Sequence, residues 1–199
     1  MGIKVTWYGD EFSDTIRRNA VRIVNRSALL VQREAQRLLS QGSSNRGATP
    51  SRPGSPPHKD TGTLARSITV DLAKLKSRRQ TRIRAATGTR LKYAAIHEFG
   101  GTIVPRTAKA LLVPIGDKGR KAMRSVSSVR ELKLSFIKRK GGKPPLLARN
   151  MGDRIEPLFV MTKRVVLPPR PYMRPALAKM TPKIRKLFSR KELLKGYRR

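Results

Sequence analysis

The chain has 199 residues and no cysteine, which excludes disulfides, thiolate metal sites and cysteine nucleophiles. Lysine and arginine total 46 against 12 aspartates and glutamates, so the net charge of +34 favours a polyanion or an acidic surface as partner. No apolar run approaches the roughly 20 residues that span a bilayer, and the start of the chain lacks the apolar run of a signal peptide. We therefore expect no membrane segment and a protein that acts where it is made.

The first forty residues predict a short strand and a long helix. Ile3, Val5 and Trp7 alternate with polar neighbours, as in a strand. A helix is expected from Asp14 to Leu39, with Ser13 or Asp14 as its N-cap. One side of this helix is apolar, and the opposite side carries Arg18, Arg22, Arg26, Arg33 and Arg37. We call these five residues the arginine stripe, which is either a solvated face or a surface that meets a polyanion or an acidic partner.

A loop follows the long helix. Residues 40–60 are rich in Gly, Ser and Pro, which predicts an exposed flexible loop or arm of about twenty residues. A helical turn is expected over residues 63–66, capped by Asp60 or Thr61.

A hairpin and a short helix come next. Residues 69–75 and 81–87 are expected to pair as a hairpin, with Arg82 and Arg84 on one face of its second strand. Like the arginine stripe, these two residues are candidates to face a polyanion or a partner. The stretch "LKYAAIHEFGG" predicts a short helix that ends at Gly100 and Gly101, because glycine readily takes the left-handed conformation after a helix.

The second half of the chain predicts several strands and a terminal helix. A strand ends at Pro114, a basic insertion at 117–150 contains a short helix and two short strands, and another strand covers 158–162. The last segment predicts an amphipathic helix that Pro182 kinks or divides, followed by a basic tail at 183–199. This tail and the loop at 40–60 are expected to be arms that order only on meeting a partner. The order of elements predicts one α+β domain over 1–199, a mostly antiparallel sheet packed by a long N-terminal helix and a C-terminal helix.

The residues that suggest catalysis are few. His97 and Glu98 are adjacent, so on a helix they diverge by about 100° and do not grip one ion. The acids have no metal-ligand spacing, and motifs for a nucleophile, a phosphate loop or a dinucleotide fingerprint are missing. We expect no enzyme, no cofactor and no metal; a nuclease would rest on His97 and Glu98 alone.

Binding to nucleic acid is favoured by charge and not by motif. A net charge of +34 predicts salt-sensitive binding dominated by phosphates. The ten aromatic residues do not interleave with the basic runs as a stacking surface would, and no zinc finger or RNA-recognition motif is visible. Any contact with DNA is therefore expected to be non-specific and electrostatic.

Three segments in this order resemble the tailed-phage virion-morphogenesis family, the gene-product-ten-like minor tail or tail-completion proteins. The segments are "PGSPPHKDTGTLARSI" at 53–68, "YAAIHEFGG" at 93–101 and "VLPPRPYMRPAL" at 166–177. The family-motif residues, which are also the candidates for a subunit interface, are Thr61, Gly62, Leu64, Ser67, Tyr93, Glu98, Phe99, Gly100, Arg170, Pro171 and Tyr172.

The resemblance implies a small α+β protein of the phage neck. Such a protein forms a ring, a hexamer, that joins the tail tube to the head connector around the DNA channel. Its implied partners are itself, head-closure or connector proteins, the tail tube or tail terminator protein, and packaged DNA. The implied location is the virion neck after assembly in the host cytoplasm. A tail terminator that caps the tube is the near alternative, and a non-specific nucleic-acid-binding protein is the alternative from another class.

Two expectations concern single residues of these motifs. Glu98 is a rare acid among many arginines, so we expect it to anchor an ion pair within the fold or across a subunit boundary. Arg170 and Arg174 are expected to pair with acids of the same or a neighbouring subunit, while Tyr172, Met173 and Leu177 anchor the last helix on the sheet.

Overall fold

The computed structural model describes residues 9–41, 50–77 and 82–197. The strand expected at residues 3–7 lies outside these ranges. The helices are α1 (Gly9–Ser40), α2 (Thr63–Arg66), α3 (Ala94–Phe99), α4 (Gly116–Arg124), α5 (Met173–Leu187) and α6 (Arg190–Leu193), with a 3₁₀ turn η1 (Val129–Leu132). The strands are β1 (Thr69–Asp71), β2 (Ala86–Gly88), β3 (Gly101–Ile103), β4 (Leu111–Pro114), β5 (Ser135–Ile137), β6 (Leu146–Asn150), β7 (Ile155–Thr162) and β8 (Val165–Leu167).

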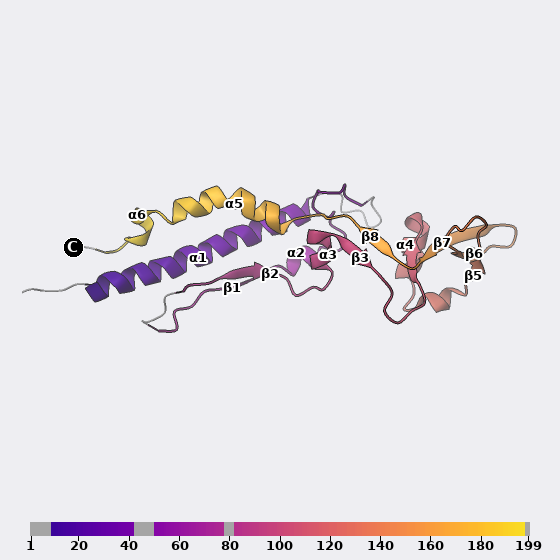
Figure 1. Ribbon diagram of the computed structural model, residues 1–199, viewed down its shortest axis with the longest axis horizontal. Helices are drawn as coiled ribbons and strands as arrows, with labels where there is room; N and C mark the ends of the chain where they lie inside the picture. The colour runs from indigo at the N-terminus through magenta and orange to yellow at the C-terminus, as the bar shows by residue number, and fades with distance from the viewer. Residues whose placement is uncertain (1–8, 42–49, 78–81, 198–199) are drawn as a thin grey trace, which may run out of the picture.

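The fold is α+β, as predicted, and it is drawn out along one axis (Figure 1). At one end, α1 and α5 run side by side and the β1–β2 hairpin lies along α1. At the other end, α4 and strands β4 to β7 form a separate cluster. We call these two parts the helical body and the distal module, the latter comprising residues 104–164. The β3–β8 pair joins them as a two-stranded ribbon.

All the strand pairs are antiparallel, but the described strands form three sheets instead of one. β1 pairs with β2, β3 pairs with β8, and the distal module holds a four-stranded sheet in the order β4-β7-β6-β5. A β-bulge between Leu147 and Ala148 interrupts the register of β6 and β7. The basic insertion expected at 117–150 is therefore the middle of a larger module, completed by β4 and β7.

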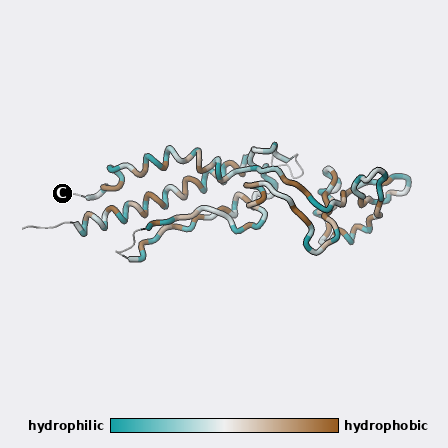
Figure 2. Tube along the Cα trace, in the orientation of Figure 1, coloured by the Kyte–Doolittle hydropathy of each residue, from teal (hydrophilic) through white to brown (hydrophobic). Residues whose placement is uncertain are grey.

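Each part has its own core. In the helical body, Val31, Ala35 and Leu39 of α1 pack with Ile68, Tyr172, Ala176 and Met180. In the distal module, Ala122 of α4 packs on Leu158 and Phe159 of β7. Figure 2 shows hydrophobic residues recurring along α1 and α5, as expected for two amphipathic helices that bury one face each.

Several predicted boundaries and loops differ from the structure. α1 begins at Gly9, so Ser13 and Asp14 lie inside it and do not cap it. The hairpin strands are shorter than predicted, because regular pairing covers only 69–71 and 86–88. The terminal helix runs through Pro182 and is divided from α6 at Phe188 and Ser189.

Two segments expected to be free arms are packed on the body. Ser51 is buried, and the Gly54 amide donates to the Pro169 carbonyl over 2.9 Å, so residues 50–60 are held to the fold. Residues 42–49 of the predicted loop lie outside the described ranges. In the C-terminal tail, the Leu193 and Lys195 carbonyls accept hydrogen bonds from the buried Asn19 side chain at 2.8 and 2.9 Å. The tail therefore packs against the N-terminal part of α1 in the same chain and is ordered without a partner.

The molecule exposes much surface for its size. The whole chain of 22.4 kDa, with the segments outside the described ranges included, exposes 15325 Å², whereas a compact monomer of that mass exposes about 9,400 Å². The elongated shape and the small, separate cores account for part of this excess.

Candidate functional site

The three motif segments of the sequence meet at Glu98. This residue lies on α3 with only 6% of its surface exposed. Its Oε2 accepts hydrogen bonds from the amides of Tyr172 at 2.8 Å and Met173 at 2.9 Å, and its Oε1 accepts one from the Arg174 amide at 2.9 Å. A carboxylate 74 residues away in sequence from Tyr172 thus caps the N-terminus of α5.

The cap leaves no amide of the first turn of α5 without a partner. The first amides of a helix lack intrahelical acceptors, and the helix dipole favours a negative charge at this end. Glu98 takes three of these amides, Pro175 has none to offer, and the Ala176 amide donates to the Tyr172 carbonyl at 3.2 Å. Pro175 therefore fits its place near the helix start.

The segments around Glu98 are held by backbone hydrogen bonds. The Arg170 amide donates to the His97 carbonyl at 2.6 Å, and the Arg170 Nε donates to the Ser51 carbonyl at 3.0 Å. Together with the bond from Gly54 to Pro169, these contacts join the loop at 50–60, the end of α3 and the approach to α5. We call this region the Glu98 junction.

Gly100 allows the close approach in the Glu98 junction. Its φ of 71° and ψ of −175° lie in a region that is essentially restricted to glycine. A Cβ there would lie 2.8 Å from the Pro169 nitrogen and 2.9 Å from the Leu167 carbonyl oxygen. The glycine ends α3 as predicted, but with extended ψ instead of the left-handed helical conformation.

The environment of His97 and Tyr172 favours packing over acid–base chemistry. Burial lowers the pKa of His97, with a further contribution from the nearby Arg170 charge. Burial raises the pKa of Tyr172 to about 12, and the charges of Glu98 and Tyr93 add to this effect. Within the described ranges, no three His, Cys, Asp or Glu side chains lie together as a metal site requires.

The motif acids and arginines have partners other than those predicted. Glu98 binds backbone amides instead of an arginine side chain. The Arg174 guanidinium lies over the Phe99 ring at 4.8 Å, and Arg170 binds a carbonyl. Among the described residues neither arginine pairs with an acid, so the expected ion pairs within the fold do not form. An ion pair across a subunit boundary stays a prediction.

The remaining motif residues surround the junction in structural roles. Gly62 has a left-handed conformation and is the N-cap residue of α2, which has no side-chain cap. Just before the helix, the Thr61 Oγ1 accepts a hydrogen bond from the Thr63 amide at 3.3 Å. Leu64 packs against the main core. The Ser67 hydroxyl donates to the Leu64 carbonyl and lies 2.7 Å from the Thr89 hydroxyl. Tyr93 packs edge-on against His97, and Pro171 is half-buried.

The arginine stripe lies on the exposed side of α1, as predicted, but three of its members have partners within the chain. Arg22 pairs with Glu192 at 3.5 Å, Arg37 pairs with Glu34 at 2.6 Å, and Arg18 donates to the Thr15 hydroxyl at 3.2 Å. Arg26 and Arg33 are exposed. The stripe is therefore partly a set of intramolecular contacts, which weakens its interpretation as a continuous polyanion surface.

The structure brings Arg82 and Arg84 to the hairpin but not into its strand. Both side chains are exposed, and both residues precede β2, which begins at Ala86.

A buried carboxylate links α1 to α5. The Glu34 side chain is 8% exposed, and it accepts two hydrogen bonds from Arg37 at 2.6 and 2.9 Å and one ion pair from Lys179 at 3.0 Å. Hydrogen bonding from Arg37 lowers the pKa of Glu34 to about 2, against the opposing effect of burial and with help from Lys179. This cluster was not predicted from the sequence, because Glu34 lies between two arginines of the stripe, Arg33 and Arg37.

The Glu34 cluster predicts a pH-dependent contribution to stability. Because the folded pKa lies below its unfolded value of 4.5, the stabilisation is complete above about pH 5 and is lost as the pH falls towards 2. We expect Glu34→Gln to lower the free energy of unfolding at pH 7 by about 1–2 kcal/mol, since exposure of the Arg37 and Lys179 side chains screens the pair. The difference from wild type should shrink to nothing near pH 2 in urea titrations. A difference that stayed constant from pH 7 to pH 2 would contradict this account.

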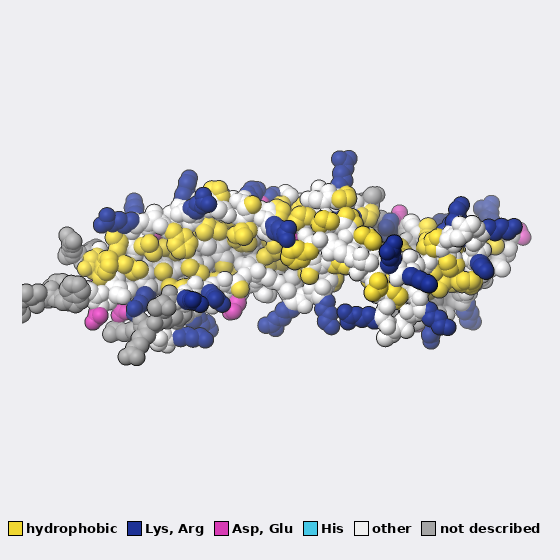
Figure 3. Space-filling model, in the orientation of Figure 1, with side chains coloured by type: hydrophobic (Ala, Val, Ile, Leu, Met, Phe, Trp, Pro, Cys, Tyr) yellow, Lys and Arg dark blue, Asp and Glu magenta, His cyan; other side chains and the backbone are white. Residues whose placement is uncertain are grey.

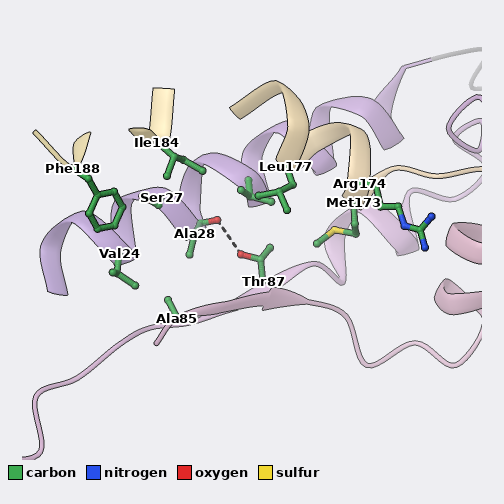
Figure 4. Close-up of a pocket in the computed structure, with 11 residues that line it drawn as sticks. Val24, Ser27, Ala28, Ala85, Thr87, Met173, Arg174, Leu177, Ile184 and Phe188 are labelled. Carbon is green, nitrogen blue, oxygen red and sulfur yellow. Dashed lines mark hydrogen bonds between the residues drawn. The ribbon is translucent and has the colours of Figure 1, made fainter. Parts of the chain in front are cut away.

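An apolar groove runs between α1, α5 and the hairpin (Figure 4). It has a volume of about 430 Å³, and its apolar lining includes Val24, Val31, Leu177, Ile184 and Phe188. At its floor the Thr87 hydroxyl donates to the Ala28 carbonyl at 3.0 Å, which ties the hairpin to α1. Leu177 and Phe188 are 52% and 46% exposed, and Figure 3 shows hydrophobic side chains along the helical body.

Comparisons of the chain with protein-family models, with curated proteins and with solved structures found no match. The functional assignment therefore depends on the motifs and on the geometry. In the part of the chain that the structure describes, no helix has both the length and the hydropathy to cross a membrane.

Proposed function

We propose that this protein is a structural component of the neck of a tailed phage or phage-like particle. In this role it is a tail-completion protein whose ring joins the tail tube to the head connector around the DNA channel. The observation that carries the proposal is the Glu98 junction, because the three motifs that resemble the family meet there although they are far apart in sequence. The position of these residues supports a role in holding the fold together and not a role in catalysis.

The apolar groove supports ring assembly through a second copy of the chain. The Leu177 and Phe188 side chains that line it are about half exposed, so a second copy that covers the groove would remove further apolar surface from water. The positive charge of the two copies need not prevent the contact, because two arginines of α1 are already neutralised within each chain. Arg22 pairs with Glu192, and Arg37 pairs with Glu34. A head-to-tail interface, in which the groove of each copy receives a different surface of the next, closes into a ring. We propose six copies.

The proposed partners are the head-closure or connector proteins on one side of the ring and the tail tube or tail terminator protein on the other. The proposed location is the virion neck, after assembly in the host cytoplasm, and the role requires no catalysis and no cofactor. A tail terminator would contact the tube end without reaching the connector. A non-specific nucleic-acid-binding protein is favoured by one observation, the net charge of +34.

Substitution in the groove tests the assembly. Leu177→Asp places a charge on the apolar lining, at a side chain that is 52% exposed and so is not needed for the core. We expect the variant to stay folded and to shift the ring to monomers, by at least about tenfold in the assembly constant, because burying an unpaired carboxylate at an interface is costly. Size-exclusion chromatography with light scattering measures the mass.

Met151→Asp is the matched control, because Met151 is 61% exposed and lies in the distal module, away from the groove. We expect it to assemble as wild type does. Equal assembly of the Leu177 variant and wild type would exclude the groove as the contact between copies.

A further inference from the structure

The four-stranded sheet of the distal module has cations at both of its ends, but only one end is free of acids. One edge of the sheet is formed by the starts of β4 and β6 and the ends of β5 and β7. The register shows this, because Leu111 pairs with Thr162, and Leu146 pairs with both Val160 and Ile137. The three connections at this edge are residues 104–110, 138–145 and 163–164. They carry eight cations and no acid: Arg106, Lys109, Lys138, Arg139, Lys140, Lys143, Lys163 and Arg164. We call this edge the basic end.

The acids of the module lie away from the basic end. Residues 104–164 contain four acids, Asp117, Glu131, Asp153 and Glu156. Asp117 lies in the first turn of α4, which follows β4, and Glu131 precedes β5. Asp153 precedes β7, and Glu156 is the second residue of β7. All four acids therefore lie near the opposite ends of the strands. Three of them are also engaged locally: Asp117 binds Arg120, Glu156 binds Lys118, and Glu131 binds the Ser128 amide.

The cations of the basic end are exposed and uncompensated. Seven of the eight side chains are exposed, and Arg139 is half-buried, with its Nε donating to the Pro144 carbonyl at 2.9 Å. Among the residues that the structure describes, none of the eight forms a salt bridge. This contrasts with the arginine stripe, where two members are neutralised within the chain. Gly141 and Gly142, both with positive φ and open space around them, let the backbone of the central connection approach a ligand closely.

From this arrangement we propose that the basic end is a binding site for the phosphate backbone of duplex DNA. Four strands spaced about 4.8 Å apart make an edge about 14 Å wide, and at 3.4 Å per step about four phosphates of one strand lie along that width. Lysine predominates, and it binds phosphate as a point charge without reading bases. An acidic protein is the weaker partner, because lysine is depleted at protein interfaces and these connections contain none of the aromatic residues or methionines that are enriched there. The inference rests on the proposed function only for the source of the DNA.

The test removes four charges from the basic end and four from elsewhere. One variant changes Lys138, Lys140, Lys143 and Lys163 to Gln; the control changes Lys183, Lys186, Lys191 and Lys195, which are exposed on the helical body, to Gln. Fluorescence anisotropy with a labelled DNA duplex, in 50 to 200 mM salt, gives the dependence of affinity on salt. The slope of log K against log salt is negative, at about −0.9 for each phosphate contact. We expect its magnitude to decrease by about 3–4 for the basic-end variant and by less than about 1 for the control. Affinity should fall at least about tenfold more in the first than in the second.

Three further measurements complete the test. A fourfold Lys→Arg variant of the basic end should bind DNA as wild type does, and unchanged thermal unfolding of every variant shows that the fold is intact. Equal losses in the two Gln variants would overturn the proposal, since they would indicate binding by total charge. A larger loss of binding to poly-L-glutamate than to DNA would overturn it in favour of an acidic protein partner. DNA binding at the basic end by a chain that forms no ring would support this inference and count against the proposed neck function.

Discussion

Glu98→Ala is expected to lower the free energy of unfolding by about 3–5 kcal/mol, because it leaves three amides at the start of α5 without an acceptor in a buried site. Hydrogen bonds to a charged acceptor are worth more than neutral ones, and the loss of the negative charge also removes its interaction with the helix dipole. Glu98→Gln keeps the shape of the side chain but brings an NH₂ group against at least one amide donor. We expect it to cost about 2–3 kcal/mol. Urea or thermal unfolding measures both.

Glu131→Ala is the matched control for Glu98. Glu131 also accepts a backbone hydrogen bond, from the Ser128 amide at 2.9 Å, but it does so on the exposed surface of the distal module. Its loss should cost less than about 1 kcal/mol, since water can replace the carboxylate. Similar losses for Glu98→Ala and Glu131→Ala would contradict the role of Glu98 as the buried cap of α5.

Gly119→Ala is expected to destabilise the distal module by about 3 kcal/mol or more, because α4 lies against β7 at this residue with no space for a side chain. A Cβ at Gly119 would overlap the Leu158 carbonyl oxygen and lie 3.2 Å from the Pro114 backbone. Leu158 belongs to the small core of the distal module, so α4 must move away and expose that core. The helical body has a separate core and should keep its helices.

Hydrogen exchange separates the two parts in this experiment. The amides of β6 and β7 should lose protection in the Gly119 variant, while those of α1 and α5 keep theirs. Gly88→Ala is the control, because a Cβ there meets nothing within 4 Å, and we expect it to cost less than about 1 kcal/mol. Loss of protection in α1 together with β7 would contradict the separation of the two cores.

The sequence predicted the long elements well because they are periodic. The apolar side of α1 is buried against α5, and the five arginines of the stripe are exposed, as the helical spacing indicated. The short strands were harder to predict: β3 and β8 have three residues each, which is too few for an alternating pattern to stand out. Their pairing, which places the distal module at the end of a ribbon, was missed.

The sequence predicted which residues form the Glu98 junction but not the interactions that they make. The motifs marked Glu98, Gly100 and Tyr172, and the structure brings all three together. Helix caps are normally expected from residues next to the helix, so a cap from another helix 74 residues away has no local signal. The tail was expected to be free because it is basic, yet Asn19 and the Phe12–Tyr197 ring contact at 5.1 Å bind it to α1. In each case contacts from a distant part of the chain decide the outcome.

We propose that this chain forms a ring that joins a tail tube to a head connector. Electron microscopy and light scattering of the purified protein, alone and mixed with a tail tube protein from the same particle, test this proposal. The account predicts ring-shaped particles with six times the 22.4 kDa mass of one chain, seated at the end of the tube. Particles with the mass of one chain, beside tubes with bare ends, would contradict it.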